Sequence, residues 1–335
     1  MMLRVGINGF GRIGRAVLRA RFKYAEFNNF EIVAINDLAP PEIIAHLFKY
    51  DTIFGKLPYQ IEIADNFMVV NNKKIWIFQE KDPAKIPWED VGVDYVIEST
   101  GLFTDAELAR AHLRGTVKRV IISAPAKGED VTIVMGVNEE VYDPNKHFII
   151  SNASCTTNCL APVLKLLDKH FTIERGFMTT VHAYTNDQRL LDMVHKKDFR
   201  RARAAALNMV PTTTGVVKAL KKVLPHLADK IDGMSIRVPT PDVSLIDLVL
   251  NVKEETSVEE VNGIFKENQN RYIGYIEEPL VSMDLVGDPH SAIVDGLLTK
   301  VIDKRLIKII AWYDNEWGYS VRLLDLINYI SKFES

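Results

Sequence analysis

The sequence predicts two domains, a doubly wound parallel α/β sheet in the first half and an α+β domain with a mixed or antiparallel sheet in the second. Three observations support this prediction. The chain has 335 residues, more than the roughly 250 to 300 at which a single hydrophobic core usually stops growing. Short β-branched runs alternate with helical patterns up to residue 151, and longer strand-like runs follow. Hydrophobic residues make up 47% and charged residues 25% of the chain, as in globular rather than disordered or fibrous proteins.

The first half is predicted to consist of βαβ units. Strand-like runs at residues 3–7 and 31–36 are followed by helical patterns at 12–22 and 41–48, and this alternation indicates parallel strands. Four further runs, each short, apolar and bounded by Gly, Asp or Asn, are predicted as buried strands. The run at residues 131–135 could equally be an edge strand. The four runs lie at residues 95–98, 117–123, 131–135 and 148–151.

The second half has a different pattern, because a helix at 156–170 precedes four long strand-like runs that favour an α+β domain. Residues 184–208 form a polar stretch without a clear period, and we interpret this stretch as functional because loops of such length usually are functional or disordered. The last segment, 319–333, has apolar residues near helical spacing and predicts an amphipathic helix. The four long runs lie at residues 175–183, 233–238, 244–252 and 306–313.

Charge and cysteine content exclude several classes of protein. Lys and Arg number 41 and Asp and Glu number 44, so the net charge is −3, too balanced for a dedicated binder of nucleic acid or of anionic membranes. Cys155 and Cys159 are the only cysteines; they give no disulfide framework and indicate a reducing, cytoplasmic compartment. No apolar run approaches the roughly 18 residues of a membrane span, so neither export nor membrane insertion is expected.

A glycine-rich turn near the N-terminus predicts a dinucleotide site. Gly9, Gly11 and Gly14 form a G-x-G-x-x-G motif between the strand at 3–7 and the helix at 12–22. In Rossmann-type domains such glycines allow a tight turn, close approach of the backbone to a pyrophosphate and close packing of helix on strand. The helix N-terminus also offers N–H groups to the phosphates. The motif alone is equally compatible with a turn that binds nothing.

Asp37 supports the dinucleotide interpretation. It lies 23 residues after Gly14 at the end of the strand at 31–36, where a carboxylate can accept hydrogen bonds from the adenosine ribose hydroxyls. Because this charge would repel a 2′-phosphate, the predicted cofactor is NAD rather than NADP. The alternative is that Asn36 and Asp37 only end the strand, a common role for both residue types.

Cys155 is the predicted nucleophile. It opens the helix predicted at 156–170, where the helix dipole and an imidazolium partner would stabilise a thiolate and backbone N–H groups could hold an oxyanion. Its spacing to Cys159 fits neither a redox pair nor, without a second cysteine pair, a zinc site, so no metal is expected. Cys159 is interpreted as an inert buried residue.

His182 is the predicted base for this thiol. It is the best placed of the eight histidines because it ends the strand at 175–183 beside the polar stretch, and a cysteine paired with a histidine is typical of nucleophilic catalysis. A single histidine at a strand end is often structural, and the sequence does not give its distance from Cys155. A cysteine hydrolase would explain both residues but would leave the glycine motif and Asp37 without a purpose.

Five segments carry a resemblance to a known family. They read NGFGRIG at 8–14, SNASCTTNC at 151–159, HAYTND at 182–187, RVPTPD at 237–242 and WYDNEWGY at 312–319. On these residues the chain resembles phosphorylating glyceraldehyde-3-phosphate dehydrogenase over almost its whole length.

The resemblance implies a reaction. Cys155 would form a thiohemiacetal with the aldehyde of D-glyceraldehyde 3-phosphate, and His182 would activate the thiol and assist hydride transfer to NAD⁺. Phosphate would then attack the thioester and release 1,3-bisphosphoglycerate. The resemblance further implies that Thr185 and Arg237 bind the substrate phosphate. It implies that the attacking phosphate is bound by Ser154, Thr156, Thr214 and Gly215, with Arg201 nearby.

Without the resemblance, residues 212–215 would be interpreted as a helix N-cap and the arginines at 200, 201 and 203 as a solvated basic face. Two positions depart from the family pattern: Lys81 replaces a frequent arginine, and Met193-Val194 stands where members that use NAD commonly have Leu-Pro. The implied cofactor contacts are Arg12 and Ile13 to the pyrophosphate, Asp37 to the ribose, Lys81 and Ser123 to the periphery, and Asn315 to the nicotinamide amide.

The family is a homotetramer in which the polar stretch lines the subunit interface, and the resemblance implies the same assembly here. It also implies an NAD-binding domain at 1–153, completed by a C-terminal helix at 316–335, and a catalytic domain at 154–315. Two alternatives are weighed. Erythrose-4-phosphate dehydrogenase shares the cysteine motif, but Thr185 favours the triose enzyme. A non-catalytic NAD-binding sensor would not be expected to keep both Cys155 and His182.

Overall fold

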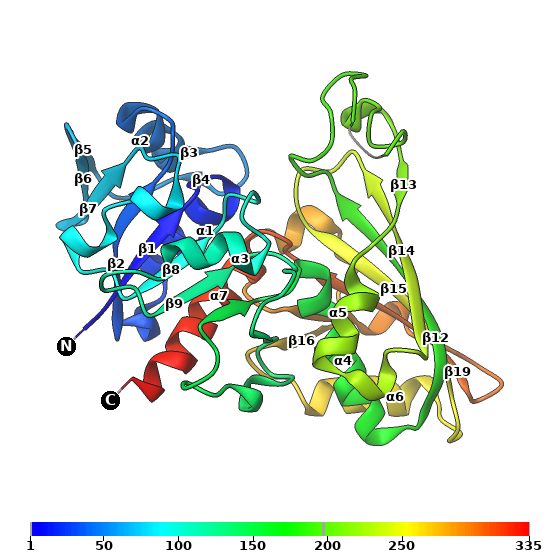
Figure 1. Ribbon diagram of the computed structural model, residues 1–335. Coiled ribbons are helices and arrows are strands. Elements are labelled where there is room, and N and C mark those ends of the chain that lie inside the picture. The colour runs from blue at the N-terminus through cyan, green and yellow to red at the C-terminus, as the bar shows by residue number, and fades with distance from the viewer. Residues whose placement is uncertain (1, 196–197, 335) are drawn as a thin grey trace. The chain divides into compact units, whose positions relative to one another are not determined.

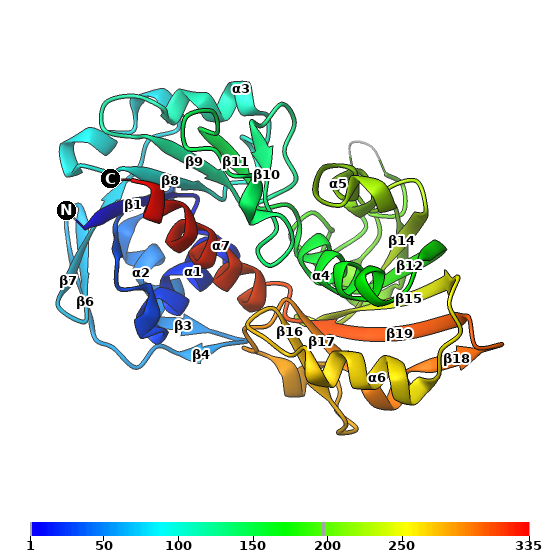
Figure 2. The ribbon, with the colours of Figure 1, turned by 90° about the horizontal axis from the view of Figure 1, so that it is seen from below.

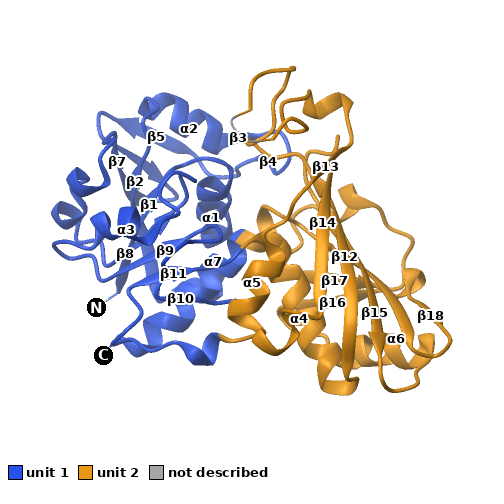
Figure 3. Ribbon diagram, turned by 45° about the vertical axis from the view of Figure 1, so that its right-hand side comes forward, with its two compact units in different colours: residues 1–135, 139–153, 320–335 blue, residues 136–138, 154–319 orange. Residues whose placement is uncertain are grey.

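The structure is a computed structural model that describes residues 2–195 and 198–334. The chain forms two compact units, coloured separately in Figure 3. Each unit has its own sheet. Unit 1 comprises residues 1–135, 139–153 and 320–335, and unit 2 comprises residues 136–138 and 154–319.

The strands of unit 1 are β1 (Leu3–Asn8), β2 (Phe30–Asn36), β3 (Tyr50–Asp51), β4 (Gly55–Lys56), β5 (Ile61–Ala64), β6 (Phe67–Val70), β7 (Lys73–Phe78), β8 (Tyr95–Glu98), β9 (Arg119–Ile122), β10 (Val131–Thr132) and β11 (Ile149–Ser151). The large sheet has the strand order β10-β11-β9-β8-β1-β2-β7-β6-β5. Neighbours from β10 to β7 run parallel, and β6 runs antiparallel to β5 and β7. The doubly wound sheet is confirmed, with a reversal of strand order at β1.

Two details of unit 1 differ from the sequence-based expectation. The run at 131–135 is the edge strand that the sequence allowed as an alternative, but its strand β10 is shorter than expected and ends at Thr132. Strands β3 to β7 were not predicted. Burial alternates along β6 and in the second half of β7, so a strand period was present in residues 67–70 and 75–78 and was overlooked. The antiparallel strands β5 and β6 extend the parallel sheet beyond β7.

Helices cover both faces of this sheet. Figure 2 shows α1 (Arg12–Lys23) beside α7 (Trp317–Ile330) on one face and α3 (Ala106–Ala109) on the other, and Figure 1 shows the same elements from a second direction. The helix α2 (Pro41–Lys49) has a proline at its first position, where the missing N–H costs no helical hydrogen bond.

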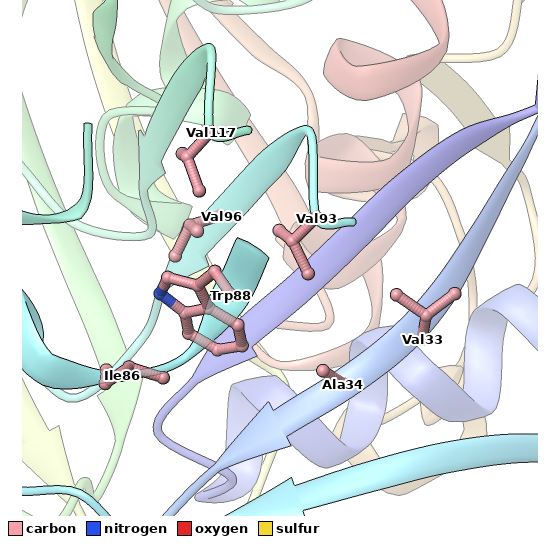
Figure 4. Packing of buried hydrophobic residues seen from close by; sticks show 7 residues of the cluster. All are labelled: Val33, Ala34, Ile86, Trp88, Val93, Val96 and Val117. Atoms are coloured by element: carbon pink, nitrogen blue, oxygen red, sulfur yellow. The ribbon is translucent and has the colours of Figure 1, made fainter. Parts of the chain in front are cut away.

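The core of unit 1 includes a cluster of seven buried residues centred on Trp88, drawn in Figure 4. The indole needs a glycine in β1, because a Cβ on Gly6 would lie 2.7 Å from a ring carbon of Trp88. Its Nε1 donates a hydrogen bond to Nδ1 of His112 over 3.1 Å, so the polar edge of this large side chain is also satisfied. The other cluster residues are Val33, Ala34, Ile86, Val93, Val96 and Val117.

Unit 2 contains a mixed sheet, as predicted. Its strands are β12 (Ile173–Ala183), β13 (Val210–Thr212), β14 (Ile231–Val238), β15 (Ser244–Val252), β16 (Ile273–Ile276), β17 (Ala292–Asp295), β18 (Lys300–Ile302) and β19 (Leu306–Tyr313). The order is β13-β14-β12-β15-β19-β17-β16, with β18 paired to β19. The neighbours β12–β14 and β16–β17 are parallel and the others antiparallel. Burial alternates along β15, as expected when one face of a sheet is covered.

Three helices of unit 2 are α4 (Cys155–His170), α5 (Val216–Val223) and α6 (Val258–Glu267). The side chain of Ser154 caps α4 by accepting a hydrogen bond from the N–H of Thr157 over 3.1 Å. The helix begins there because the serine satisfies one of the backbone donors that have no partner within the helix.

The C-terminal helix α7 exists as predicted, but it is not amphipathic. Of its residues, only Asn328 and Tyr329 are not buried. Its polar side is buried as well, and the guanidinium of Arg322 forms an ion pair with Asp325 at 2.7 Å. The prediction failed because polar residues at helical spacing were assigned to solvent. Within residues 2–195 and 198–334, no helix has the length and apolar character needed to cross a membrane.

Candidate active site

The reaction centre proposed from the sequence lies in unit 2 and joins two distant segments. Cys155 is the first residue of α4, and His182 lies near the end of β12. The Sγ atom of Cys155 is 3.4 Å from Nε2 of His182. The cysteine is partly exposed and the histidine is buried. A thiol at a helix N-terminus thus contacts a ring nitrogen, the arrangement that nucleophilic catalysis requires.

The charge state of this pair differs from the one expected from the sequence, in which His182 would be a protonated imidazolium. Burial and the neighbouring Arg237 lower the pKa of His182 to about 3, so the ring is neutral near pH 7. Burial raises the pKa of Cys155, against the opposing effects of Arg237 and of the N–H groups at the start of α4. The resting pair is therefore a thiol and a neutral imidazole, and His182 is available to accept the thiol proton.

The second ring nitrogen of His182 has two neighbours. Nδ1 lies 2.7 Å from the carbonyl oxygen of Ala183 and 2.8 Å from Nη1 of Arg237. A guanidinium can only donate, so Nδ1 carries a proton toward Ala183 only when Nη1 of Arg237 donates instead to the carbonyl oxygen of Ala183 or the hydroxyl of Thr185, at 3.2 and 3.3 Å. In that tautomer Nε2 is free to accept the proton of Cys155. Arg237 is brought to this position by the strand pairing, because His182 and Arg237 are register partners on β12 and β14.

Arg237 also meets the predicted Thr185. Its Nη1 donates to the hydroxyl of Thr185 at 3.3 Å, and its buried Nε has no acceptor. A guanidinium with an unused N–H beside a hydroxyl can bind the oxygens of an anion. The structure thus brings Thr185, Arg237 and His182 together.

Arg201 is placed differently. Its guanidinium is an ion-pair partner of Asp187 and Asp198, and it donates to the hydroxyl of Thr212 over 2.7 and 2.9 Å. Asp187 also accepts the hydroxyl proton of Thr185. Arg201 is therefore connected to Thr185 through Asp187, a residue of the segment at 182–187 for which no role was predicted.

The remaining predicted anion ligands lie at two helix N-termini. The hydroxyl of Ser154 caps α4, and that of Thr156 is 3.0 Å from the hydroxyl of Tyr313. Gly215 is the exposed residue before α5, and the hydroxyl of Thr214 accepts from the N–H of Val216 at 3.3 Å. Both helix starts present backbone N–H groups, which bind anions.

Tyr313 is a part of the centre that the sequence analysis missed. Its hydroxyl lies 3.0 Å from that of Thr156 on α4 and 2.8 Å from that of Thr180 on β12. Its ring meets the ring of His182 edge to face, with centroids 6.0 Å apart. It therefore ties the helix that carries Cys155 to the strand that carries His182. The motif at 312–319 contains this tyrosine, but only the three-dimensional packing reveals the contact.

Unit 1 contains the glycine turn. Gly9 has φ +91°, and a Cβ there would lie 2.6 Å from the backbone N of Thr100. A Cβ on Gly14 would lie 2.4 Å from the carbonyl oxygen of Gly9, whereas one on Gly11 would meet nothing within 4 Å. The first and third glycines are thus needed by the fold itself. The second leaves open space at the N-terminus of α1, so these residues fit the pyrophosphate of a dinucleotide.

Asp37 holds this turn from the next strand. One carboxylate oxygen accepts from the N–H of Phe10 at 2.8 Å and the other from the N–H of Ala39 at 3.0 Å. The group is half-buried and keeps acceptor capacity for hydroxyl groups. Arg12 forms an ion pair with Asp51, so its side chain is held beside the start of α1.

The other predicted cofactor residues lie apart from the turn in sequence. In unit 1, Ile13 is half-buried on α1, Lys81 is exposed after β7, and Ser123 follows β9. In unit 2, Asn315 is buried, and its Oδ1 accepts a hydrogen bond from the hydroxyl of Ser244 at 2.6 Å. Ser244 is a second residue that the sequence analysis missed. Over the described parts of the chain, no group of three or more His, Cys, Asp or Glu side chains could hold a metal ion.

Comparison with known proteins decides the family. The sequence model of the glyceraldehyde 3-phosphate dehydrogenase NAD binding domain matches residues 3–106, and that of the C-terminal domain matches residues 154–315. The chain belongs to the glyceraldehyde-3-phosphate dehydrogenase family. Among its relatives, glyceraldehyde-3-phosphate dehydrogenase of Geobacillus stearothermophilus is 54% identical over 335 residues, with 99% of each chain covered.

Other members of the glyceraldehyde-3-phosphate dehydrogenase family match over the same length. Glyceraldehyde-3-phosphate dehydrogenase 2 of Streptomyces avermitilis is 53% identical, with 98% of this chain and 99% of the relative covered. The enzyme of Mycobacterium avium is 52% identical, with 99% of each chain covered. The family named from five sequence segments is confirmed, and the NAD binding domain of the family agrees with the predicted cofactor.

Proposed function

We propose that this chain oxidises and phosphorylates D-glyceraldehyde 3-phosphate through a covalent thioester on Cys155. Family membership makes the chain an NAD-dependent oxidoreductase that acts on glyceraldehyde 3-phosphate. The observation that supports the covalent route is the 3.4 Å contact between Sγ of Cys155 and Nε2 of a neutral His182 at the N-terminus of α4.

The first step is addition of Cys155 to the substrate aldehyde. The sulfur forms a bond to the carbonyl carbon while its proton passes to Nε2 of His182, and the carbonyl oxygen becomes the hydroxyl of a thiohemiacetal. Backbone N–H groups at the start of α4 stabilise the negative charge that develops on this oxygen. The proton on His182 is then returned to that oxygen.

The second and third steps convert the thiohemiacetal to product. Bound NAD⁺ supplies the acceptor for the hydride that leaves the thiohemiacetal carbon. His182 takes the hydroxyl proton as the thioester forms on Cys155. An oxygen of inorganic phosphate then attacks the thioester carbon, the C–S bond breaks, and Cys155 leaves as a thiolate while the acyl phosphate is released.

Two groups of residues are proposed to bind the anions. Arg237 and Thr185 bind the substrate phosphate, supported by the buried Nε of Arg237 that has no acceptor. The attacking phosphate is bound at the starts of α4 and α5, with Arg201 nearby through its hydrogen bonds to the hydroxyl of Thr212. The residues proposed for this second pocket are Ser154, Thr156, Thr214 and Gly215.

The cofactor is proposed to lie against the glycine turn of unit 1. The N–H groups at Arg12 and Ile13 face the pyrophosphate, the carboxylate of Asp37 binds the ribose, and the open space at Gly11 supports this placement. Lys81 and Ser123 lie at the periphery, and Asn315 binds the nicotinamide amide. We assign the NAD-binding domain to residues 1–153 with the helix at 316–335, and the catalytic domain to residues 154–315.

The assembly and location follow from the same proposal. We propose a homotetramer whose interface includes the stretch at 184–208, where Leu190, Val194 and Phe199 are strongly exposed and form apolar surface that a partner would cover. Neither cysteine is in a disulfide, which supports a cytoplasmic location.

The proposal is tested by following the absorbance of reduced nicotinamide with purified protein, NAD⁺ and D-glyceraldehyde 3-phosphate, with and without phosphate. We expect phosphate-dependent turnover and a stoichiometric burst of reduced nicotinamide when phosphate is omitted, because the thioester then accumulates. Erythrose 4-phosphate is assayed in parallel. Preference for the tetrose would change the substrate, and no burst would contradict the thioester.

A further inference from the structure

Two buried carboxyl groups of unit 2 take no part in the proposed chemistry. Asp242 and Asp314 are 0% and 1% exposed, and their side chains are within hydrogen-bond reach of each other. Two carboxylate groups cannot share a hydrogen bond unless one of them carries a proton. The pair lies beside residues that the proposed function uses, since Asp314 directly precedes Asn315 in the chain.

The surroundings decide which of the two is ionised. Asp314 accepts three backbone N–H groups, from Gly287 at 2.7 Å, Glu316 at 3.0 Å and Trp317 at 2.6 Å. It also caps the N-terminus of α7, whose dipole favours a negative charge. Burial raises the pKa of Asp314, and these N–H groups oppose that effect. Asp314 is therefore the carboxylate of the pair.

Asp242 has far fewer donors. Its Oδ1 accepts from the N–H of Val243 at 2.8 Å, and its buried Oδ2 meets no N–H or O–H group. The charged groups that act most strongly on it are the acids Asp314 and Glu316. An ionised carboxylate in this position would be buried without compensation. Burial and Asp314 accordingly raise the pKa of Asp242, which makes it the protonated partner.

The backbone brings this pair to the cofactor residue. Val243, between Asp242 and Ser244, has φ +61°, a conformation that β-branched residues rarely adopt. On one side of this strained residue Asp242 reaches Asp314, and on the other the hydroxyl of Ser244 donates to Oδ1 of Asn315 at 2.6 Å. The segment at 242–244 therefore holds Asp314 and Asn315 through two adjacent hydrogen bonds.

We propose that Asp242 is a buried carboxylic acid whose Oδ2–H donates to Asp314, and that this shared proton keeps Asn315 in position to bind the nicotinamide amide. Asp242 is thus a positioning residue for the cofactor. The inference rests on the proposed role of Asn315. Loss of the proton at alkaline pH places two negative charges in contact and disturbs the start of α7 and Asn315 together.

Asp242→Asn is the decisive variant, because the asparagine amide donates the same hydrogen bond without needing a proton. The folded wild type holds this proton above the pKa of an unfolded aspartate, about 3.9. Its stability therefore falls as the pH rises from that value to the folded pKa. We expect the unfolding equilibrium constant of the wild type, relative to that of Asp242→Asn, to increase by up to about tenfold per pH unit in this window.

The measurement is urea unfolding of the full chain between about pH 5 and about pH 9, at one protein concentration. Both forms carry Cys155→Ser, so that ionisation of the thiol does not contribute. Asp295→Asn is the matched control, since Asp295 is also buried in unit 2. Unlike Asp242, its two carboxylate oxygens each accept a hydrogen bond from an N–H group, Nε1 of Trp312 and the backbone N–H of Leu297. The control is expected to lose stability. An equal loss in Asp242→Asn at every pH would overturn the proposal.

NAD⁺ binding, measured by calorimetry on the same proteins, tests the positioning role without turnover. The wild-type affinity, followed to about two pH units above the folded pKa of about 9, should fall by up to about tenfold per pH unit over that range, and Asp242→Asn should keep its affinity. The stability of the wild type could change with pH as predicted while the NAD⁺ affinities of the wild type and of Asp242→Asn are both independent of pH. That result would refute the positioning role and leave the thioester mechanism intact.

Infrared spectroscopy of wild-type protein with ¹³C-labelled aspartate provides a test that needs no variant. A carboxylic-acid band near neutral pH that disappears at alkaline pH is expected. Its absence near neutral pH would show that Asp242 is ionised and would overturn the proposal.

Discussion

The two units carry their proposed binding residues in different ways. In unit 1 the binding surface is backbone: the turn at Gly9 and the start of α1 offer N–H groups, and few side chains take part. In unit 2 the proposed site consists of side chains from separate elements. These are Cys155 on α4, His182 on β12, Arg237 on β14 and Tyr313 on β19. The first arrangement is encoded in one short segment, whereas the second exists only after the sheet has formed.

The supports beneath the two surfaces differ as well. In unit 1 the buried Glu98 accepts from Nδ2 of Asn8 at 2.6 Å, from Nε2 of His112 at 3.1 Å and from the N–H and hydroxyl of Thr100. Since Trp88 donates to Nδ1 of His112, the proton of this ring lies on Nε2 and points at Glu98. In unit 2, Asp242 has one backbone donor. A buried acid can thus be stabilised by donors or by a proton of its own.

The largest effect is expected where chemistry depends on one side chain. Cys155→Ser should abolish phosphate-dependent oxidation of the triose, because a hydroxyl is far harder to ionise than a thiol. Binding of NAD⁺, measured by calorimetry, should stay unchanged, since the backbone surface of unit 1 is untouched. Turnover close to the wild-type rate would contradict the covalent mechanism.

His182→Gln should lower kcat by about 10² to 10⁴, the usual contribution of a general base. A second readout is stability. The pKa of His182 is lowered in the folded protein to about 3, below the value of about 6.5 in an unfolded chain. The wild type therefore loses stability as the pH falls from about 6.5 towards 3. The free energy of unfolding of His182→Gln, measured with urea, should not show this loss at acid pH. If it depends on pH in the same way as that of the wild type, the ring of His182 is charged in the folded protein.

Two glycine variants separate folding from binding in unit 1. Gly9→Ala should lower the free energy of unfolding by about 1 to 3 kcal/mol, because φ is +91° and the new Cβ would meet Thr100. Gly11→Ala should leave unfolding nearly unchanged, since its Cβ enters open space, but should weaken NAD⁺ binding measured by calorimetry. Unchanged binding in Gly11→Ala would mean that the pyrophosphate does not approach this turn.

The smallest effect is expected at Asp37. Asp37→Asn keeps an oxygen that can accept from the N–H of Phe10 but removes the charge that repels a 2′-phosphate. The ratio of kcat/KM for NAD⁺ over NADP⁺ should fall by up to about tenfold, or about 1.4 kcal/mol. Asp37→Ala is the comparison, because it also loses the hydrogen bond to the turn. If neither variant changes the ratio, cofactor choice is made elsewhere, with Met193 and Val194 the next residues to test.

How well the sequence predicts a feature depends on how far apart in the chain the interacting residues lie. The glycine turn, the start of α4 after Ser154 and the alternating strands depend on neighbours in the chain, and the sequence predicts them. Tyr313, Ser244 and Asp314 act through contacts with residues 71 to 157 positions away or through burial, and residue type alone does not reveal these contacts. The C-terminal helix was misjudged for the same reason, since the burial of Arg322 depends on what surrounds it.

The burial of the two thiols has a practical consequence for anyone who handles this protein. Cys155 is partly exposed, whereas Cys159 is fully buried and its pKa is raised well above that of a free thiol. An alkylating or oxidising reagent should therefore modify the folded chain at one position and the denatured chain at two. The ratio of these two titrations gives the fraction of correctly folded subunits in a preparation, without substrate or cofactor.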